Sequence, residues 1–279
     1  MSTYEDYSRA AADYDRSRVA VGADVVLGAA VAAGVRLSSA QVLDAGCGTG
    51  AYSEAIAAHV ASLTLVDANE GMLHQAEAKL GAAGQVEVHQ ALLPDLPFDD
   101  GAFDVVMVHQ VLHHLGDEEH DGRDWRGHRA AVAELARLVG PGGVLVINTC
   151  SQTQLRTGYW YYALVPEAAD ALRRRYAPLE VLEQAAVAAG LDSTQRMVPV
   201  DAVLQGPSYF DGRSPLDPGW RNGDSAWSLA SAEELASALG QVQELDASPG
   251  GALDAFVAEH DGPRLDVGQL TFLTARRLL

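Results

Sequence analysis

Short apolar runs alternate with longer segments of mixed polarity through the first half of the chain. The runs predict strands at residues 41–45, 63–67, 85–89, 103–109 and 143–149. Each run is largely continuous in its apolar character, as in strands whose two faces are both covered. The intervening segments predict helices at residues 51–60, 70–81 and 128–138. This alternation is typical of an α/β protein with a parallel sheet and helices on both faces.

The segments that flank this alternating core follow other patterns. An N-terminal helical segment is predicted at residues 4–34. A helical stretch should follow the aromatic residues 159–162, and a sixth strand should come later. Further predictions are a helix at 178–190, an irregular segment at 205–224, a short helix at 232–239 and a final strand at 269–276. The irregular segment is rich in Gly, Pro, Asp and Ser, which favour turns.

A glycine-rich loop follows the first predicted strand. Glycine stands at every second position from Gly46 to Gly50, and Asp44 precedes the loop. Without side chains, this backbone can turn sharply and let a ligand approach closely. The next helix would direct its N-terminal amides and positive dipole end toward that ligand. A second strand ends at Asp67, near the point where an acid meets ribose hydroxyls in nucleotide-binding βαβ units.

Four segments, in the correct order and spacing, resemble the motifs of class I S-adenosylmethionine-dependent methyltransferases. They are the glycine loop at 42–50, the acidic segment at 65–73, the run into the fourth strand at 96–106 and the turn at 138–147. The resemblance covers about residues 10–150. A dinucleotide-dependent dehydrogenase is less consistent with the chain, because the glycine spacing differs from Gly-x-Gly-x-x-Gly.

The resemblance implies a Rossmann-like, seven-stranded, mostly parallel sheet with helices on both faces and an antiparallel last strand. We expect a single methyltransferase domain over residues 1–279, with a helical cap at 1–40, a cofactor-binding core at 41–150 and a substrate-pocket insertion at 151–279. The implied cofactor is S-adenosyl-L-methionine, and the product is S-adenosyl-L-homocysteine. The implied reaction is in-line methyl transfer to an O, N or C nucleophile of a small molecule.

The resemblance also implies particular cofactor contacts. Asp44 should orient the loop and contact the methionine amino group, and Asp67 should accept hydrogen bonds from both ribose hydroxyls. The loop residues that should surround the methionine portion are Ala45, Gly46, Cys47 and Gly48. Ala68 and Met72 should flank the adenine, although Met72 could equally be a core residue.

Two residues of the N-terminal segment match a cap that folds over the methionine end of the cofactor in related enzymes. These are Tyr14 and Arg18. An arginine suits the cofactor carboxylate because it is always charged and offers a planar fork of donors. A surface helix with salt bridges is an equal alternative for this segment.

One position departs from the family pattern. The family places an Asp where it meets the adenine amino group, and here Leu92 occupies that position. Either backbone groups around Leu92 and Leu93 recognise the adenine, or Asp95 reaches in from a shifted loop. We favour backbone recognition.

The end of the fourth predicted strand carries the candidate catalytic residues. In the family this end faces the transferring methyl group, which places His109 near the cofactor or the acceptor. An imidazole can deprotonate a hydroxyl or an amine near neutral pH. His113 or His114 is the candidate general base, although His-His-Leu is common here in the family and often orders the loop structurally.

Aromatic residues supply the candidate acceptor contacts. Tyr159, Trp160, Tyr161 and Tyr162 form the densest aromatic cluster. Such rings can stack on an acceptor or surround a sulfonium, but they are more often core residues. The segment at 220–227, which includes Trp227, is the second candidate. Tyr7 of the cap and His113 complete the candidate acceptor site.

Composition and charge limit the partners. The formal net charge of −19 and the pI of about 4.7 argue against nucleic acid, which binds clustered Lys and Arg. The acidic segment at 117–124 matches no metal-ligand spacing, so we expect no metal. Cys47 and Cys150 are not in paired spacing, which favours a reducing cytoplasm. The apolar segment at 19–35 is interrupted by Asp24, so we expect no membrane span. We expect a monomer or a homodimer.

Two other functions fit the same motifs. The cofactor could be used for aminocarboxypropyl transfer, for its own cyclisation or in a reaction without group transfer. Alternatively, the chain could be a non-catalytic regulatory protein that binds S-adenosylmethionine. The intact motifs argue against the second possibility.

Overall fold

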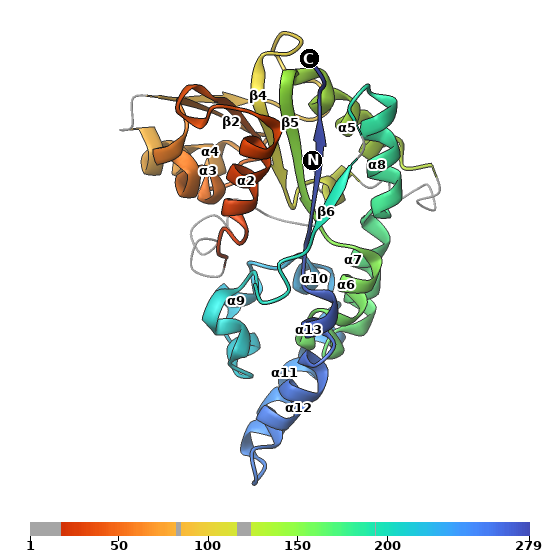
Figure 1. The fold of residues 1–279 in the computed structure, drawn as a ribbon. Coiled ribbons are helices and arrows are strands. Elements are labelled where there is room, and N and C mark those ends of the chain that lie inside the picture. The colour runs from red at the N-terminus through yellow and green to blue at the C-terminus, as the bar shows by residue number, and fades with distance from the viewer. Residues whose placement is uncertain (1–17, 82–84, 116–123, 193) are drawn as a thin grey trace.

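A seven-stranded sheet with the order β3-β2-β1-β4-β5-β7-β6 forms the centre of the structure (Figure 1). The structure is a computed structural model that describes residues 18–81, 85–115, 124–192 and 194–279. The strands are β1 Gln41–Ala45, β2 Ser62–Asp67, β3 Val86–Gln90, β4 Phe103–His109, β5 Val139–Thr149, β6 Gln195–Met197 and β7 Thr271–Arg276. Strands β1 to β5 pair in parallel, whereas β7 is antiparallel to both β5 and β6. The predicted Rossmann-like, mostly parallel sheet is confirmed.

Helices cover both faces of this sheet. On one side lie α2 Ala23–Ala33, α3 Ala51–Ile56 and α4 Glu70–Leu80, and on the other lie α5 Arg126–Leu138 and α8 Leu179–Ala188 (Figure 1). Successive side chains of a strand point to opposite faces of the sheet, so alternate residues pack against different groups of helices. Val105 and Met107 of β4 pack toward the first group of helices, whereas Val106 and Val108 pack toward the second. Burying each such side chain fully contributes about 1.5–3 kcal/mol.

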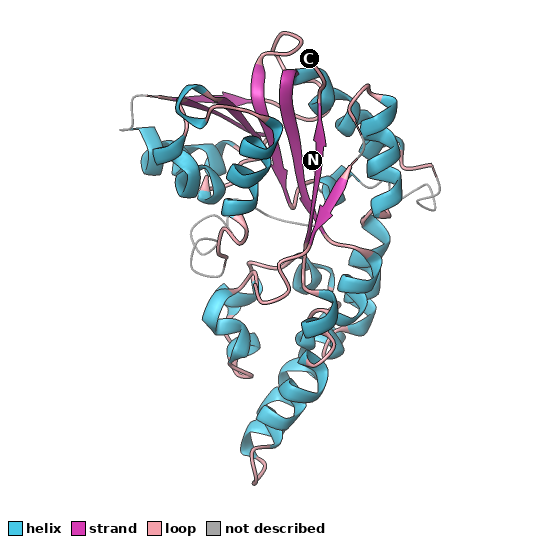
Figure 2. Cartoon of the chain, in the orientation of Figure 1, coloured by secondary structure: helices cyan, strands magenta, loops and turns pink. Residues whose placement is uncertain are grey.

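The remaining helices lie beyond the carboxyl ends of the parallel strands (Figure 2). They are α6 Gln152–Thr157, α7 Pro166–Arg175, α9 Pro218–Arg221, α10 Ser225–Leu229, α11 Ala232–Ala247, α12 Ala252–Asp261 and α13 Arg264–Val267. Trp160, Tyr161 and Tyr209 are fully buried among them and form the centre of this region. No helix in the described ranges is both long and apolar enough to cross a bilayer.

Several predicted boundaries were wrong. The helix predicted at 51–60 ends at Ile56 and continues only as a 3-10 turn over Ala57–His59. The helix predicted at 232–239 runs to Ala247, because packing against α12 outweighs the cost of about 1 kcal/mol for Gly240 inside a helix. The segment at 205–224, predicted to be irregular, contains short helical turns as well as α9.

Candidate functional site

The glycine loop between β1 and α3 adopts a backbone that side chains disfavour. Gly46, Gly48 and Gly50 have φ angles of 78°, 53° and 79°. A Cβ atom on Gly46 would lie 2.4 Å from Cγ2 of Val111. The carbonyl of Val66 accepts hydrogen bonds from the amides of Gly46 (2.7 Å) and Cys47 (2.9 Å). The loop is therefore tied to the end of β2, and Gly46 meets both a steric and a conformational requirement for glycine.

Asp67 at the end of β2 holds the loop from the other side. Its Oδ2 accepts a hydrogen bond from the amide of Gly48 (2.9 Å), and its Oδ1 accepts one from the amide of Asn69 (2.8 Å). Burial raises the pKa of this carboxyl group above its usual value, while the two amides oppose that shift. A carboxylate oxygen has two lone pairs, so each one can still accept a hydroxyl donor.

Asp44 lies beneath the loop at the end of β1 and is almost fully buried. Its Oδ2 accepts a hydrogen bond from Oγ of Ser53 (2.7 Å), whereas its Oδ1 has no hydrogen-bond partner among the described residues. Burial raises the pKa of Asp44 to about 7. A nearby cation or donor would stabilise the ionised form of this carboxyl group and lower that pKa.

His109 ends β4 with a buried, uncharged ring. The ring stacks on Tyr52 of α3 with a centroid separation of 3.6 Å and an interplanar angle of 5°. Burial lowers its pKa to about 3, so the imidazole is neutral at physiological pH. Neither ring nitrogen has a hydrogen-bond partner within the described part of the chain.

These elements surround a cavity of about 180 Å³ at the carboxyl ends of β1, β2 and β4. Its walls include the glycine loop and Asp67 together with apolar side chains such as Met72 and Leu96. The predicted contacts that line the cavity are Ala45, Gly46, Gly48, Asp67, Ala68, Met72, Leu92, Leu93 and His109. The sequence thus identified residues from four separate segments that meet at one cavity.

Other predicted cofactor contacts lie elsewhere. Asp44 and Cys47 are buried behind the loop and are not among the residues that line the cavity. Asp95 is exposed, and its amide donates to the carbonyl of Leu92 (3.0 Å) in a tight turn. Asp95 does not line the cavity either. This placement supports adenine recognition by the backbone near Leu92. Tyr7 and Tyr14 lie outside the described residues.

A small chamber of about 30 Å³ adjoins the cavity, and Gln110 and His114 line both spaces. Its lining residues are mostly polar although they are largely buried. They include the predicted residues Arg18, His113, Tyr159 and Tyr162. The structure therefore places Arg18 at the chamber, whereas the sequence led us to expect it at the cofactor carboxylate. A contact with the cofactor remains a prediction.

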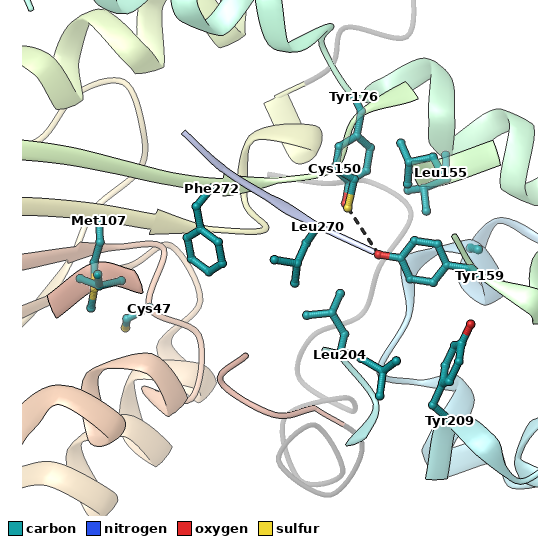
Figure 3. Packing of buried hydrophobic residues seen from close by; sticks show 14 of the residues in the cluster. Cys47, Met107, Cys150, Leu155, Tyr159, Tyr176, Leu204, Tyr209, Leu270 and Phe272 are labelled. Atoms are coloured by element: carbon teal, nitrogen blue, oxygen red, sulfur yellow. Dashed lines mark hydrogen bonds between the residues drawn. The ribbon is translucent and has the colours of Figure 1, made fainter. Parts of the chain in front are cut away.

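Gln110 separates the cavity from the chamber, and its backbone has an unusual φ of 54° for a residue with a side chain. Its Nε2 donates to Oδ1 of Asn148 (3.0 Å). Its Oε1 accepts hydrogen bonds from the hydroxyl of Tyr176 (3.0 Å) and from the thiol of Cys150 (3.6 Å). The Cys150 sulfur also lies 3.4 Å from the hydroxyl of Tyr159 (Figure 3). These contacts hold Gln110 in a backbone conformation that costs about 1–3 kcal/mol.

A buried carboxylate, Asp224, also lines the chamber. It accepts hydrogen bonds from the hydroxyl of Tyr161 (2.7 Å), the amide of Ala226 (2.9 Å) and the hydroxyl of Tyr162 (3.4 Å). Nη2 of Arg18 lies 3.4 Å from its Oδ2. Arg18 also donates from Nε to the carbonyl of Gly223. The N-terminal segment and the late insertion therefore meet at this ion pair.

The remaining predicted aromatic contacts lie in the interior. Trp160 and Tyr161 are fully buried, and Nε1 of Trp160 donates to the carbonyl of Tyr209 (2.7 Å). Trp227 packs nearly parallel to Tyr161, with ring centroids 6.0 Å apart. None of these three residues lines the chamber, and their contact with an acceptor remains a prediction.

Sequence reasoning missed several residues of the site. They are Tyr52, Gln110, Asn148 and Tyr176. Asn148 offered the clearest signal, because it is a polar residue near the end of an apolar strand. It is almost fully buried and donates from Nδ2 to the hydroxyl of Tyr52 (2.9 Å).

The described part of the chain contains no group of three His, Cys, Asp or Glu side chains that could hold a metal ion. Most of the acidic segment at 117–124 lies outside the described residues. The expectation that no metal is needed therefore stays a prediction.

Comparison with known proteins agrees with this geometry. Residues 43–147 match the sequence model of a family described as "Methyltransferase domain". A demethylmenaquinone methyltransferase of Clavibacter sepedonicus is 33% identical over 155 residues, which cover 53% of this chain and 59% of that protein. The matched region thus spans less than two thirds of that relative.

Solved structures share the fold over nearly the whole chain. A putative methyltransferase from an antibiotic biosynthesis pathway of Anabaena variabilis superposes with a TM-score of 0.67 at 17% identity, covering 94% of this chain and 99% of that one. A geranyl diphosphate C-methyltransferase of Streptomyces coelicolor, solved with S-adenosyl-L-homocysteine, gives a TM-score of 0.53 at 14% identity. That match covers 92% of this chain and 78% of the other.

Proposed function

Because the chain belongs to the class I S-adenosylmethionine-dependent methyltransferases, we propose that it transfers the methyl group of S-adenosyl-L-methionine to an O, N or C atom of a small-molecule acceptor. The observation that carries the proposal is the cavity in which Asp67, the glycine loop and an apolar wall meet. The Clavibacter relative is named for a small-molecule acceptor, which supports this substrate class.

The residues around the cavity fit the cofactor part by part. Asp67 retains lone pairs for the two ribose hydroxyls, and Met72 and Leu93 supply apolar contacts for the adenine. Asp44 lies behind the loop and has one buried oxygen without a partner among the described residues, which suits a water-mediated contact with the methionine ammonium group. The glycine loop leaves room for close approach of the ligand to the backbone.

When bound, the cofactor supplies an electrophilic methyl group on a sulfonium ion. The protein must then hold the acceptor in line with that methyl group and exclude water. His109 suits this environment because its neutral ring adds no positive charge beside a sulfonium. Its stacking on Tyr52 fixes the orientation of the ring.

Product analysis tests the proposal directly. The protein is incubated with S-adenosyl-L-methionine and a panel of small hydroxyl, amine and carbon-nucleophile acceptors, and the nucleoside products are identified by mass spectrometry. Formation of S-adenosyl-L-homocysteine with a methylated acceptor would support methyl transfer. Formation of methylthioadenosine would instead indicate transfer of the aminocarboxypropyl group.

Cofactor binding should release a proton from Asp44. In the free protein its pKa is about 7, so the side chain is largely protonated at pH 6. An ammonium group nearby favours the ionised form, so binding should release this proton between about pH 5 and pH 7. Calorimetry of S-adenosyl-L-homocysteine binding in buffers of different ionisation enthalpy measures the release. Asp44→Asn should abolish it, and an equal proton release in that variant would remove Asp44 from this role.

Replacing His109 with phenylalanine should affect methyl transfer more than cofactor binding. Phenylalanine keeps the stacked ring beside Tyr52 but lacks both ring nitrogens, which have no hydrogen-bond partner among the described residues and can contact the acceptor. We expect the affinity for S-adenosyl-L-homocysteine to change by less than about threefold, and turnover to fall by at least about tenfold. His59→Phe, on an exposed turn, is the matched control. Unchanged turnover in His109→Phe would exclude a role for its nitrogens near the acceptor.

A further inference from the structure

We propose that the chamber beside the cavity holds the reacting group of the acceptor and that this group is an uncharged hydroxyl. The inference rests on the proposed function and narrows its acceptor class. It follows from the position of the chamber, the pairing of its charges and the hydrogen-bonding capacity of His113.

The chamber lies next to the cavity proposed for the cofactor. It adjoins the cavity through Gln110 and His114, which line both spaces. Gln110 directly follows β4, and the carboxyl ends of parallel strands are where ligands bind in sheets of this kind. The volume of about 30 Å³ is enough for a group the size of a water molecule or a hydroxyl. The chamber therefore fits the reacting group of an acceptor.

The charges in the chamber are already paired. Among the described residues that line it, Arg18 and Asp224 carry formal charges and lie 3.4 Å apart. Donors from Tyr161, Tyr162 and Ala226 also occupy the Asp224 carboxylate. An ammonium or a carboxylate group would therefore enter a buried space in which the two charges are already paired with each other, which is costly. A hydroxyl avoids that cost.

The histidines of the chamber add no compensating charge. Burial lowers the pKa of His113 well below its usual value and lowers that of His114 to about 3. Both rings are therefore neutral near pH 7. Their environment favours a neutral ligand over a charged one.

His113 provides an acceptor atom for a hydroxyl. Its side chain is almost fully buried and its ring stacks on Tyr176 with centroids 4.5 Å apart. Its Nε2 lies 3.4 Å from Oγ of Ser225, whereas its Nδ1 has no hydrogen-bond partner in the described part of the chain. When Nε2 carries the proton and donates to Ser225, Nδ1 presents a lone pair. A hydroxyl proton is the matching donor.

This arrangement gives a balanced transfer step. A lone pair of the acceptor oxygen forms the new O–C bond as the S–C bond breaks, and the sulfur keeps the electrons of the broken bond. The hydroxyl proton passes to Nδ1 of His113 and later to solvent, and because the sulfonium loses its positive charge in the same step, the net charge of the site does not change. The acceptor leaves as a neutral methyl ether.

The test uses methanol, methylammonium and formate, which are small probes with neutral, cationic and anionic groups. Each is titrated at constant ionic strength into the protein, with and without S-adenosyl-L-homocysteine, and the ¹⁵N signals of the His113 ring are followed by NMR. His113→Gln assigns the signals. We expect methanol to shift the Nδ1 signal and the two ions to leave it unchanged. A stronger shift with either ion, or no shift with methanol, would overturn the proposal.

Two charge variants sharpen the test. Arg18→Gln leaves Asp224 without its ion pair and should raise the apparent affinity for methylammonium at least about tenfold. Asp224→Asn leaves Arg18 without its ion pair and should raise the apparent affinity for formate by a similar factor. Asp224→Asn keeps a side-chain oxygen to cap Ala226, and thermal unfolding monitors the fold of both variants. Unchanged probe preference in folded variants would contradict the charge argument. Failure of S-adenosyl-L-homocysteine to bind the unmodified protein would instead contradict the proposed function. The two failures can be distinguished because the preference among the probes is also measured without S-adenosyl-L-homocysteine.

Discussion

Replacing Gly46 with valine should lower the affinity for S-adenosyl-L-homocysteine by at least about 100-fold, because the new side chain adds backbone strain and overpacking. Gly46 has a φ of 78°, and its Cβ position lies 2.4 Å from Cγ2 of Val111. Relief of this collision requires the loop or Val111 to move, and both line the cavity. Calorimetry with S-adenosyl-L-homocysteine measures the loss.

A matched control separates strain from collision. Gly34 has a φ of 92° at the end of α2, and a Cβ atom there would meet nothing within 4 Å. Gly34→Val should therefore destabilise the fold by about 1–2 kcal/mol and leave cofactor affinity unchanged. In a second comparison, Gly46→Ala should also lower the affinity for S-adenosyl-L-homocysteine, because its Cβ atom meets Val111. Adding Val111→Ala should restore part of that affinity, since it removes Cγ1 and Cγ2 of Val111, the two atoms closest to the new Cβ. Normal binding by Gly46→Val would refute the assignment of the loop.

The sequence predicted the parts of the fold that depend on local pattern. Continuous apolar runs predicted the strands of the parallel core. The spacing of Asp44, Gly46 and Asp67 predicted the position of the loop and of the cavity beside it. These residues work through backbone geometry close to their own positions. Local sequence is therefore sufficient to identify them.

Contacts between distant segments could not be predicted in this way. Arg18 and Asp224 form an ion pair although 205 residues lie between them in the chain. The sequence led us to expect Arg18 at the cofactor carboxylate. Its ion pair with Asp224 could not be foreseen, because the sequence gives the type of side chain but not its partner. In the same way, the hydrogen bond from the hydroxyl of Tyr161 to Asp224 joins two segments that are distant in the sequence, and it could not be predicted from either of them.

The missed residues share one physical role, which is to join the sheet to the late insertion. Tyr52 stacks on His109 and accepts a hydrogen bond from Asn148, and Asn148 in turn accepts one from Gln110. Gln110 then accepts a hydrogen bond from Tyr176 of the insertion. This chain of contacts links the cavity to the chamber. No single segment of sequence contains enough of it to be recognised.

Asp67→Asn should weaken binding of S-adenosyl-L-homocysteine by about 1.5–3 kcal/mol, the usual contribution of hydrogen bonds to a charged group. The carboxylate now accepts hydrogen bonds from the amides of Gly48 and Asn69 through different oxygens. An asparagine has one acceptor oxygen and one NH₂ group, so one of the two amides would face a donor. The variant therefore loses acceptors for the ribose and also loosens the loop.

Asp95→Asn is the matched control, because Asp95 is exposed and does not line the cavity. The affinity of Asp95→Asn for S-adenosyl-L-homocysteine should stay within about twofold of that of the unmodified protein, as is usual for surface substitutions. Comparison of S-adenosyl-L-homocysteine with adenine as ligands then locates the effect of Asp67→Asn. If Asp67 meets the ribose, the variant should lose affinity for the nucleoside and keep that for adenine. Equal losses for both ligands would mean that Asp67 acts only by shaping the loop.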